Sequence, residues 1–170
     1  VYGQSALLAA NADFTYFTEK SVLAADSPLV ISAGSGKNLP KNEVGGAAAL
    51  KHTGLVSCVC KKMSDIRASI GKVLGILPDF GGAVLDDGED LNKAFPALNK
   101  KCGAAELIKA VFDADSFVEI GNNSAPEVRC ILGRVGGISV AAVVYDGENG
   151  VLLDAVNIAK ITSFVEFASY

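Results

Sequence analysis

The 170-residue sequence predicts an α/β fold, and two observations carry this prediction. First, segments with the apolar spacing of helices alternate with short runs of β-branched and aromatic residues along the whole chain. Second, 50% of the residues are hydrophobic and only 20% are charged, which provides for a core and argues against disorder. The length fits one full domain or two incomplete ones.

The N-terminal half predicts helices and strands in turn. In order, we expect a helix over 1–12 that is buried on most faces, strands over 13–18 and 21–25, a helical turn over 29–33 that stops at Gly34, a helix over 41–52, a strand over 55–60 and a helix over 65–77. Gly45 and Gly46 lower the helix propensity of 41–52 by about 1 kcal/mol each and indicate closely packed backbones. We expect Ser64 to cap the last helix and Pro78 to end it.

The amino-acid composition changes after residue 78. Residues 79–90 (DFGGAVLDDGED) are rich in glycine and then acidic, and we interpret them as a linker between one domain over 1–78 and another over 91–170. Beyond it we expect a helix over 104–113, strands over 116–121, 127–135 and 138–146, and a final helix over 152–168. Gly136 and Gly137 join the last two strands as a hairpin turn, because both can take a positive φ.

Composition narrows the function classes. The net charge is −4, whereas a nucleic-acid-binding protein typically has a positively charged face, so this composition argues against nucleic-acid binding. No apolar run reaches the ~20 residues of a membrane helix, and no signal peptide is evident. Cys58, Cys60, Cys102 and Cys130 do not have zinc spacing and His52 is the only histidine, so we expect free thiols in a reducing cytoplasm and no bound metal.

Several local motifs fail as functional sites. Residues 33–37 (AGSGK) hint at a phosphate loop but lack its first glycine and its Ser/Thr. His52 has no nucleophile motif near it, which leaves a catalytic triad unsupported. Residues 122–124 match a glycosylation acceptor that a cytoplasmic chain would not use. The acidic residues in 86–90 could hold a cation, although an acidic linker explains them better.

The start of the chain carries the one constellation that suggests chemistry. A glycine at the start of a buried helix, Gly3, leaves unpaired backbone N–H groups with the helix dipole behind them, an arrangement that suits an oxyanion or an enolate oxygen. No strand leads into this helix, and the helix that ends near Tyr170 should lead into one. We therefore expect an internal piece of a longer polypeptide.

A series of motifs resembles the biotin-dependent acyl-CoA carboxyltransferases. In order and spacing, NADFTYF, SVLAADSPLVISAGSGK, EVGGAAALKHTGLVSCV and IGKVLGILP are similar to the second half of that family's N-terminal domain. After the linker, AELIKAVFDADSFVEI and ILGRVGGISVAAVV resemble the opening of its C-terminal domain. No single motif is decisive, and the ordered series carries the resemblance.

The resemblance implies a crotonase-like spiral of ββα units, with the end of one domain and the start of a second, related domain. It also implies transfer of a carboxyl group between biotin on a carrier protein and an acyl-CoA. In such enzymes carboxybiotin loses CO₂, the biotin ureido oxyanion removes the α-proton, and the thioester enolate attacks CO₂. Paired backbone N–H groups hold each oxyanion, and the first-domain turn falls on Gly3 and Gln4, where Gln4 replaces a usual second glycine.

The partners implied are an acyl-CoA, the biotin carboxyl carrier protein and further copies of the parent chain in a homo-oligomer. The isolated 170 residues should be inactive as a transferase or ligase component, since they hold at most one of two oxyanion sites. Two alternatives remain. One is a non-catalytic crotonase-like interaction or scaffold module, which the Gln4 departure favours. The other is a crotonase-fold hydratase, which would need paired carboxylates that the sequence does not reveal.

Overall fold

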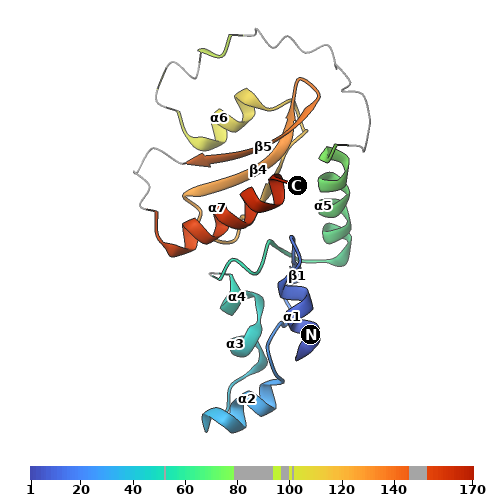
Figure 1. Ribbon diagram of the computed structural model, residues 1–170, viewed down its shortest axis with the longest axis vertical. Helices are drawn as coiled ribbons and strands as arrows, with labels where there is room; N and C mark the ends of the chain where they lie inside the picture. Colours follow the sequence, from blue (N-terminus) through green and yellow to red (C-terminus); the bar gives the residue numbers. More distant parts are fainter. Residues whose placement is uncertain (52, 79–93, 97–99, 101, 146–152) are drawn as a thin grey trace.

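The computed structural model describes residues 1–51, 53–78, 94–96, 100, 102–145 and 153–170 (Figure 1). The first half contains α1 (Gln4–Ala10), β1 (Tyr16–Thr18), α2 (Pro28–Ser35), α3 (Lys41–Gly45), α4 (Ala47–Leu50), β2 (Cys58–Cys60) and α5 (Met63–Ile76). The second half contains α6 (Ala104–Val111), β3 (Val118–Ile120), β4 (Val128–Val135), β5 (Ile138–Tyr145) and α7 (Ala155–Ala168). Strands β1 and β2 pair in parallel, and β3, β4 and β5 form an antiparallel sheet. The predicted α/β class is confirmed.

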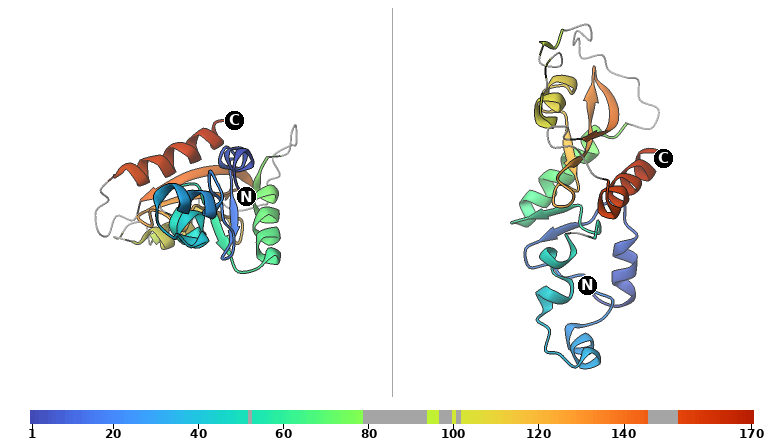
Figure 2. Two further views of the ribbon diagram at one scale, coloured as in Figure 1. Left: turned by 90° about the horizontal axis from the view of Figure 1, so that it is seen from below. Right: turned by 90° about the vertical axis from the view of Figure 1, so that its left-hand side faces the viewer.

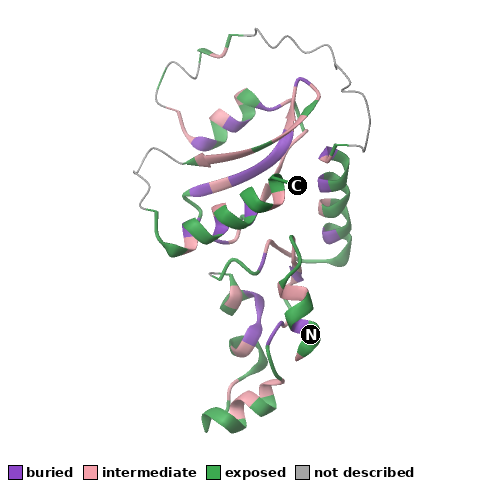
Figure 3. Cartoon of the chain, in the orientation of Figure 1, coloured by how far each residue is buried: buried purple, intermediate pink, exposed green. Residues whose placement is uncertain are grey.

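The antiparallel sheet has a helix on each face, and β4 is its central strand. Because successive strand residues point to opposite faces, Ile131 packs with Ile108 and Phe112 on the α6 side. Its neighbour Cys130 packs with Phe164 of α7 on the other side. The strand is therefore largely buried between the two helices (Figure 3).

The hairpin between β4 and β5 turns at Gly136 and Gly137, as predicted. Their φ values are 58° and 79°, which L residues with side chains rarely adopt. Both amides donate to the Asp113 carboxylate, at 2.8 and 2.9 Å. This carboxylate anchors the turn to the end of α6.

The helix α1 is less buried than its sequence suggests. Ala6 faces a small core with Phe17 and Leu23, but the side chains of Leu7 and Leu8 are 62% and 77% exposed. The prediction of a helix buried on most faces is therefore wrong among the described residues. A run of small and apolar residues gives no polar stripe from which the covered face could be identified.

The predicted strand over 21–25 is reduced to isolated bridges. One bridge joins Val22 to Gly46 and another joins Tyr2 to Ala24. Among the described residues, this segment has no continuous partner strand on either side, so no ladder forms there. The prediction of a β-strand over 21–25 was therefore wrong, although the segment is extended.

The predicted helix over 41–52 is broken into α3 and α4 at Gly46, whose ψ of 164° is extended. The close backbone packing expected at the two glycines is found at Gly45, whose backbone lies against that of Leu23. A Cβ added to Gly45 would lie only 2.8 Å from the carbonyl carbon of Leu23. The Leu23 amide donates to the Gly45 oxygen at 2.9 Å. The two glycines therefore let the 21–25 segment cross directly against the helix backbone.

Two helix boundaries differ from the predicted ones. The helix α5 begins at Met63, and the Asp65 carboxylate accepts from the amide of the N-cap residue Lys62 at 3.1 Å, so Ser64 lies inside the first turn and is not the cap. The helix α2 is longer than the expected turn and ends at Ser35, because the C-cap residue Gly36 has a φ of 67° that stops it. The predicted end of α5 before Pro78 is confirmed.

The two halves of the chain meet along α5 and α7 (Figure 2). Val73 of α5 shares a core cluster with Leu132 of β4, and the rings of Phe14 and Phe167 stack edge to face at 4.5 Å between centroids. The predicted linker over 79–90 lies outside the described residues. The division into domains over 1–78 and 91–170 stays a prediction.

Candidate functional site

The turn before α1 is held by the segment that crosses beneath it. The Gly3 amide donates to the Ala25 oxygen at 3.1 Å, and the Ala24 amide donates to the Val1 oxygen at 3.2 Å. Gly3 has φ 65° and ψ −142°, a conformation that a residue with a Cβ rarely adopts. The space above it is open among the described residues, since a Cβ added there would meet none of their heavy atoms within 4 Å.

This geometry separates the two residues predicted to form an oxyanion site. The Gly3 amide is already bonded to Ala25, and its oxygen accepts from the Ala6 amide at 2.9 Å. Gln4 is the first residue of α1 and is exposed. Within the described part of the chain, its amide has no hydrogen-bond acceptor. The Gln4 N–H therefore remains available to a ligand at this turn, and the amide of Ser5, the next residue, likewise has no acceptor among the described residues.

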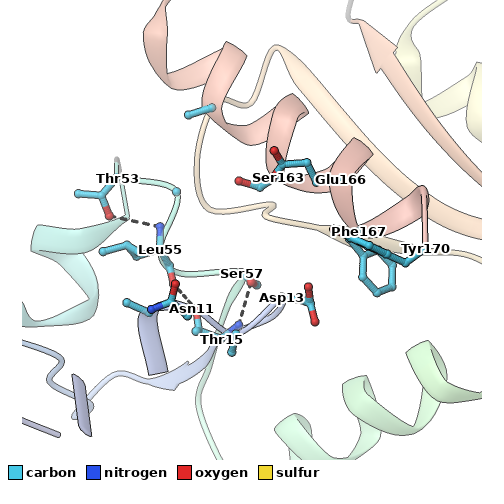
Figure 4. A pocket seen from close by; sticks show the side chains of 14 residues that line it. Asn11, Asp13, Thr15, Thr53, Leu55, Ser57, Ser163, Glu166, Phe167 and Tyr170 are labelled. Carbon is cyan, nitrogen blue, oxygen red and sulfur yellow. Dashed lines mark hydrogen bonds between the residues drawn. The ribbon is translucent and has the colours of Figure 1, made fainter. Parts of the chain in front are cut away.

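A polar cleft of about 390 Å³ lies at the opposite end of α1, between the segment over 53–57 and α7 (Figure 4). The Ser57 hydroxyl accepts from the Thr15 amide at 2.9 Å, and the Thr15 hydroxyl donates to the Leu55 oxygen. The Thr53 hydroxyl donates to the Leu50 oxygen at 2.7 Å. The Ser57 and Thr15 hydroxyls fasten residues 55–57 to the residue before β1, whereas the Thr53 hydroxyl bonds back to the end of α4.

Two carboxylates line this cleft from opposite ends of the chain. Asp13 precedes β1, and Glu166 lies on α7. Neither has an ion-pair partner among the described residues. The sequence did not reveal this pair of carboxylates. Asp13 and Glu166 are far apart in the chain, and only the packing of α7 brings them to one cleft.

A buried amine lies beside the cleft. Lys160 of α7 is 7% exposed, and its Nζ donates to the oxygens of Ser124 at 2.8 Å, Ala125 at 3.3 Å and Val128 at 2.6 Å. Burial lowers the pKa of Lys160. Burial also raises the pKa of the neighbouring Cys130 thiol to about 11, against the opposing effect of the Lys160 charge. With three acceptors, the ammonium holds a loop in place and is not free to act as a nucleophile.

The remaining sequence motifs have structural explanations where they are described. Residues 33–37 lie at the C-terminal end of α2 and just beyond it, whereas a phosphate loop leads directly into the start of a helix. Ser124 of the glycosylation match is buried and 3% exposed. His52 and the acidic residues over 86–90 lie outside the described residues. Among the side chains that the structure describes, no three of His, Cys, Asp or Glu gather as a metal centre would require.

The described helices include none that is both long and apolar enough to cross a bilayer. The profile of the carboxyl transferase domain matches residues 2–170, so the chain belongs to this family. A comparison with curated proteins gives no match. The ordered motifs of the sequence therefore identified the family correctly, and the crotonase-like fold that they implied is confirmed by the solved structures below.

Three solved structures show that likeness. Transcarboxylase 12S with methylmalonyl-coenzyme A and methylmalonic acid bound is 23% identical over 98% of this chain, with a TM-score of 0.79. Transcarboxylase 12S with hydrolysed methylmalonyl-coenzyme A is 23% identical over 98%, with a TM-score of 0.82. A single-chain, multi-domain long-chain acyl-CoA carboxylase is 18% identical over 96%, with a TM-score of 0.70. This chain spans 35% and 36% of the two transcarboxylase chains and 18% of the carboxylase.

Proposed function

We propose that residues 1–170 form part of an enzyme that transfers a carboxyl group between carboxybiotin on a carrier protein and an acyl-CoA. The observation that carries this proposal is the carboxyl transferase domain match over residues 2–170. The likeness in fold to transcarboxylase 12S, whose structures contain methylmalonyl-coenzyme A or its hydrolysed form, supports the acyl-CoA as the substrate class.

The turn at Gly3 and Gln4 is the place where this chain would act. When bound, carboxybiotin supplies the CO₂, and the acyl thioester must develop an enolate to accept it. The open space above Gly3 leaves room for an oxygen to approach the backbone, and the Gln4 N–H has no acceptor of its own. A fixed N–H aimed at a developing enolate oxygen stabilises the transition state, and losing one such donor typically costs about 2.7–4 kcal/mol. Glycine at position 3 keeps the approach clear of a side chain.

The test removes this one N–H without removing the helix. Gln4 is the first helical residue, where proline is tolerated because the missing N–H has no intrahelical partner. Gln4→Pro, made in a carboxyltransferase polypeptide that contains these residues, should lower kcat/KM by about 10²–10³-fold. The matched control Gln4→Ala keeps the N–H and should stay within about threefold of the parent. Circular dichroism should show the same helix content for both variants.

The outcomes separate the site from the function. If Gln4→Pro and Gln4→Ala turn over equally, the oxyanion assignment is wrong while the transferase proposal stands. A variant with a side chain at Gly3 is less informative, because the φ of 65° would strain Gly3→Val and lower stability together with rate.

A non-catalytic crotonase-like scaffold is the second candidate, and one observation favours it. The Gly3 amide is bonded to Ala25, so one of the two amides expected to form the oxyanion site, those of Gly3 and Gln4, is not available to a ligand. A polypeptide that binds an acyl-CoA but transfers no carboxyl group to or from a biotinylated carrier would establish this alternative. In either case we propose that the 170 residues alone have no turnover.

We also propose the binding partners that a carboxyltransferase function requires. These are an acyl-CoA, a biotin carboxyl carrier protein and, by analogy with the hexamer assembly described for transcarboxylase 12S, further copies of the parent chain. A reducing cytoplasm is proposed because Cys58, Cys60, Cys102 and Cys130 are all free thiols.

A further inference from the structure

The strand β2 carries two cysteines on one face. Cys58 and Cys60 pair with Tyr16 and Thr18 of β1 in parallel register, and their Sγ atoms are 3.6 Å apart. Val59 between them points the other way and packs against the core cluster of the first half. The two thiols are thus neighbours in space as well as in sequence, on the side of the strand away from that core.

The surroundings of the pair allow access from solvent. Both cysteines are partly exposed, whereas Cys130 is completely buried. Burial raises the pKa of the Tyr16 hydroxyl, a hydrogen bond to Ser69 of α5 opposes this rise, and the neighbouring cysteines add to it. Burial, followed by the hydrogen bond to Cys60, raises the pKa of Cys58 to about 11. Cys58 therefore keeps its proton near neutral pH and lies against Cys60 as a thiol.

We propose that Cys58 and Cys60 are a redox modification site, which closes reversibly into a disulfide when a low-molecular-mass disulfide such as glutathione disulfide oxidises it. Residues two apart in a strand have Cα atoms roughly 6.6 Å apart, inside the ~4.4–6.8 Å range of disulfides. The sulfurs must approach from 3.6 Å to about 2.05 Å. This closure requires a local bend of the strand.

The position of Cys60 makes such a bend feasible. It is the last residue of β2, and the exposed Lys61 and Lys62 follow it. Only the terminal pair with Thr18 must move, while Val59 can stay in the core. The bridge closes a small ring under strain, and strained or exposed disulfides are easily reduced. The site should therefore respond to the redox state rather than stay permanently bridged.

The reaction balances with the oxidant named. The Cys60 thiolate attacks one sulfur of glutathione disulfide and releases one glutathione thiolate, which leaves a mixed disulfide on Cys60. Cys58 then loses its proton and attacks the Cys60 sulfur, releasing the second glutathione. Two protein thiols are oxidised, and one glutathione disulfide is reduced to two thiols.

The experiment uses the chain in glutathione buffers of increasing oxidised fraction. Remaining thiols are trapped with N-ethylmaleimide before trypsin digestion and mass spectrometry. Trypsin cleavage after Lys51 and Lys61 puts both cysteines in one peptide, HTGLVSCVCK. We expect this peptide to lose the mass of two hydrogens, to take up no N-ethylmaleimide, and to return fully to the dithiol when reduced glutathione is added.

Single variants provide the controls. Cys58→Ser and Cys60→Ser cannot form the ring, so this peptide should carry glutathione or N-ethylmaleimide and never lose two hydrogens. Cys102, which is also partly exposed, reports on non-specific oxidation. A parent peptide that stays a dithiol or carries glutathione while Cys102 is fully modified would overturn the proposal. None of these measurements depends on carboxyl transfer, so they are independent of the proposed function.

Discussion

The Nζ of Lys160 on α7 lies 2.6 Å from the backbone oxygen of Val128, the first residue of β4. The same ammonium reaches the oxygens of Ser124 and Ala125, in a loop where Ala125 has a φ of 45°. A residue with a Cβ occupies that region only when its surroundings enforce it. The buried amine therefore fixes the path by which the chain leaves β3 and enters β4.

Lys160→Met keeps an unbranched side chain one atom shorter and removes the donor. It should lower the free energy of unfolding by about 2–4 kcal/mol, because buried carbonyls left without a partner retain their desolvation penalty. Urea denaturation measures this. Lys72→Met on the exposed side of α5 is the matched control and should stay within about 0.5 kcal/mol of the parent. Equal stability of the two variants would show that water replaces the amine.

The pH dependence of stability should report on Cys130 beside that amine. Burial raises the pKa of its thiol from 9.0 to about 11, and the neutral thiol is the favoured form in the fold. The unfolded chain therefore loses this proton at lower pH than the folded chain does. The stabilisation that the neutral Cys130 thiol contributes to the fold is therefore complete below about pH 9. It is lost as the pH rises toward 11.

Cys130→Ala should remove this loss. With a reductant present, the parent should lose about 1–2 kcal/mol more than the variant between pH 8.5 and pH 11 in urea denaturation. The difference between the two slopes is the relevant quantity, because the substitution also changes packing at every pH. Lys160, whose pKa burial lowers, contributes in the opposite direction and is present in both chains. Parallel slopes would contradict the burial of a neutral thiol.

Gly45 should be intolerant of any side chain. An added methyl group would overlap the Leu23 carbonyl group, whose carbon would lie 2.8 Å away, and neither backbone can move without breaking the bond from the Leu23 amide to the Gly45 oxygen. We expect Gly45→Ala to lower the midpoint of urea denaturation by an amount equivalent to about 2–3 kcal/mol.

Gly34→Ala is the matched control within another helix. Gly34 lies inside α2, and an added Cβ would meet no heavy atom of the described residues within 4 Å, so alanine should stabilise the chain by about 0.5–1 kcal/mol. The two substitutions are chemically identical and should have opposite signs. A small effect at Gly45 would show that the close crossing with Leu23 is not maintained in solution.

The contact between the two halves depends on a helix end. Arg134 of β4 donates to the Gly75 oxygen at 2.6 Å, and the Ser139 hydroxyl of β5 donates to the Ile76 oxygen. Both oxygens belong to the last turn of α5, where carbonyls have no intrahelical donors. The hairpin thus caps a helix that precedes it by many residues in the chain.

Arg134→Met with Ser139→Ala should loosen this end. We expect the amides of the last turn of α5 to exchange hydrogen about tenfold faster or more, which corresponds to losing a charged hydrogen bond of about 1.5–3 kcal/mol. Hydrogen exchange followed by mass spectrometry gives the rate for each segment. Arg67→Met, exposed on the same helix, should leave these rates unchanged. Unchanged exchange in the double variant would mean that the apolar contacts alone join the halves.

The sequence by itself determined the features that depend on neighbours along the chain. Gly136 and Gly137 predicted the hairpin because a tight hairpin turn with positive φ at both central residues favours glycine at each of them. The alternation of a strand placed Cys58 and Cys60 on one face, and the ordered series of motifs identified the carboxyl transferase family. Each of these depends on local backbone geometry or on a pattern read in chain order.

Only the tertiary structure decided which groups find distant partners. It paired the Gly3 amide with the Ala25 oxygen and left the Gln4 amide available to a ligand. It also exposed Leu8 and brought Lys160 to three carbonyl groups. A run of small and apolar residues has no preferred face of its own, and an amide takes whichever acceptor the packing places within about 3 Å. These outcomes depend on how segments far apart in sequence settle against one another, and local sequence does not specify that geometry.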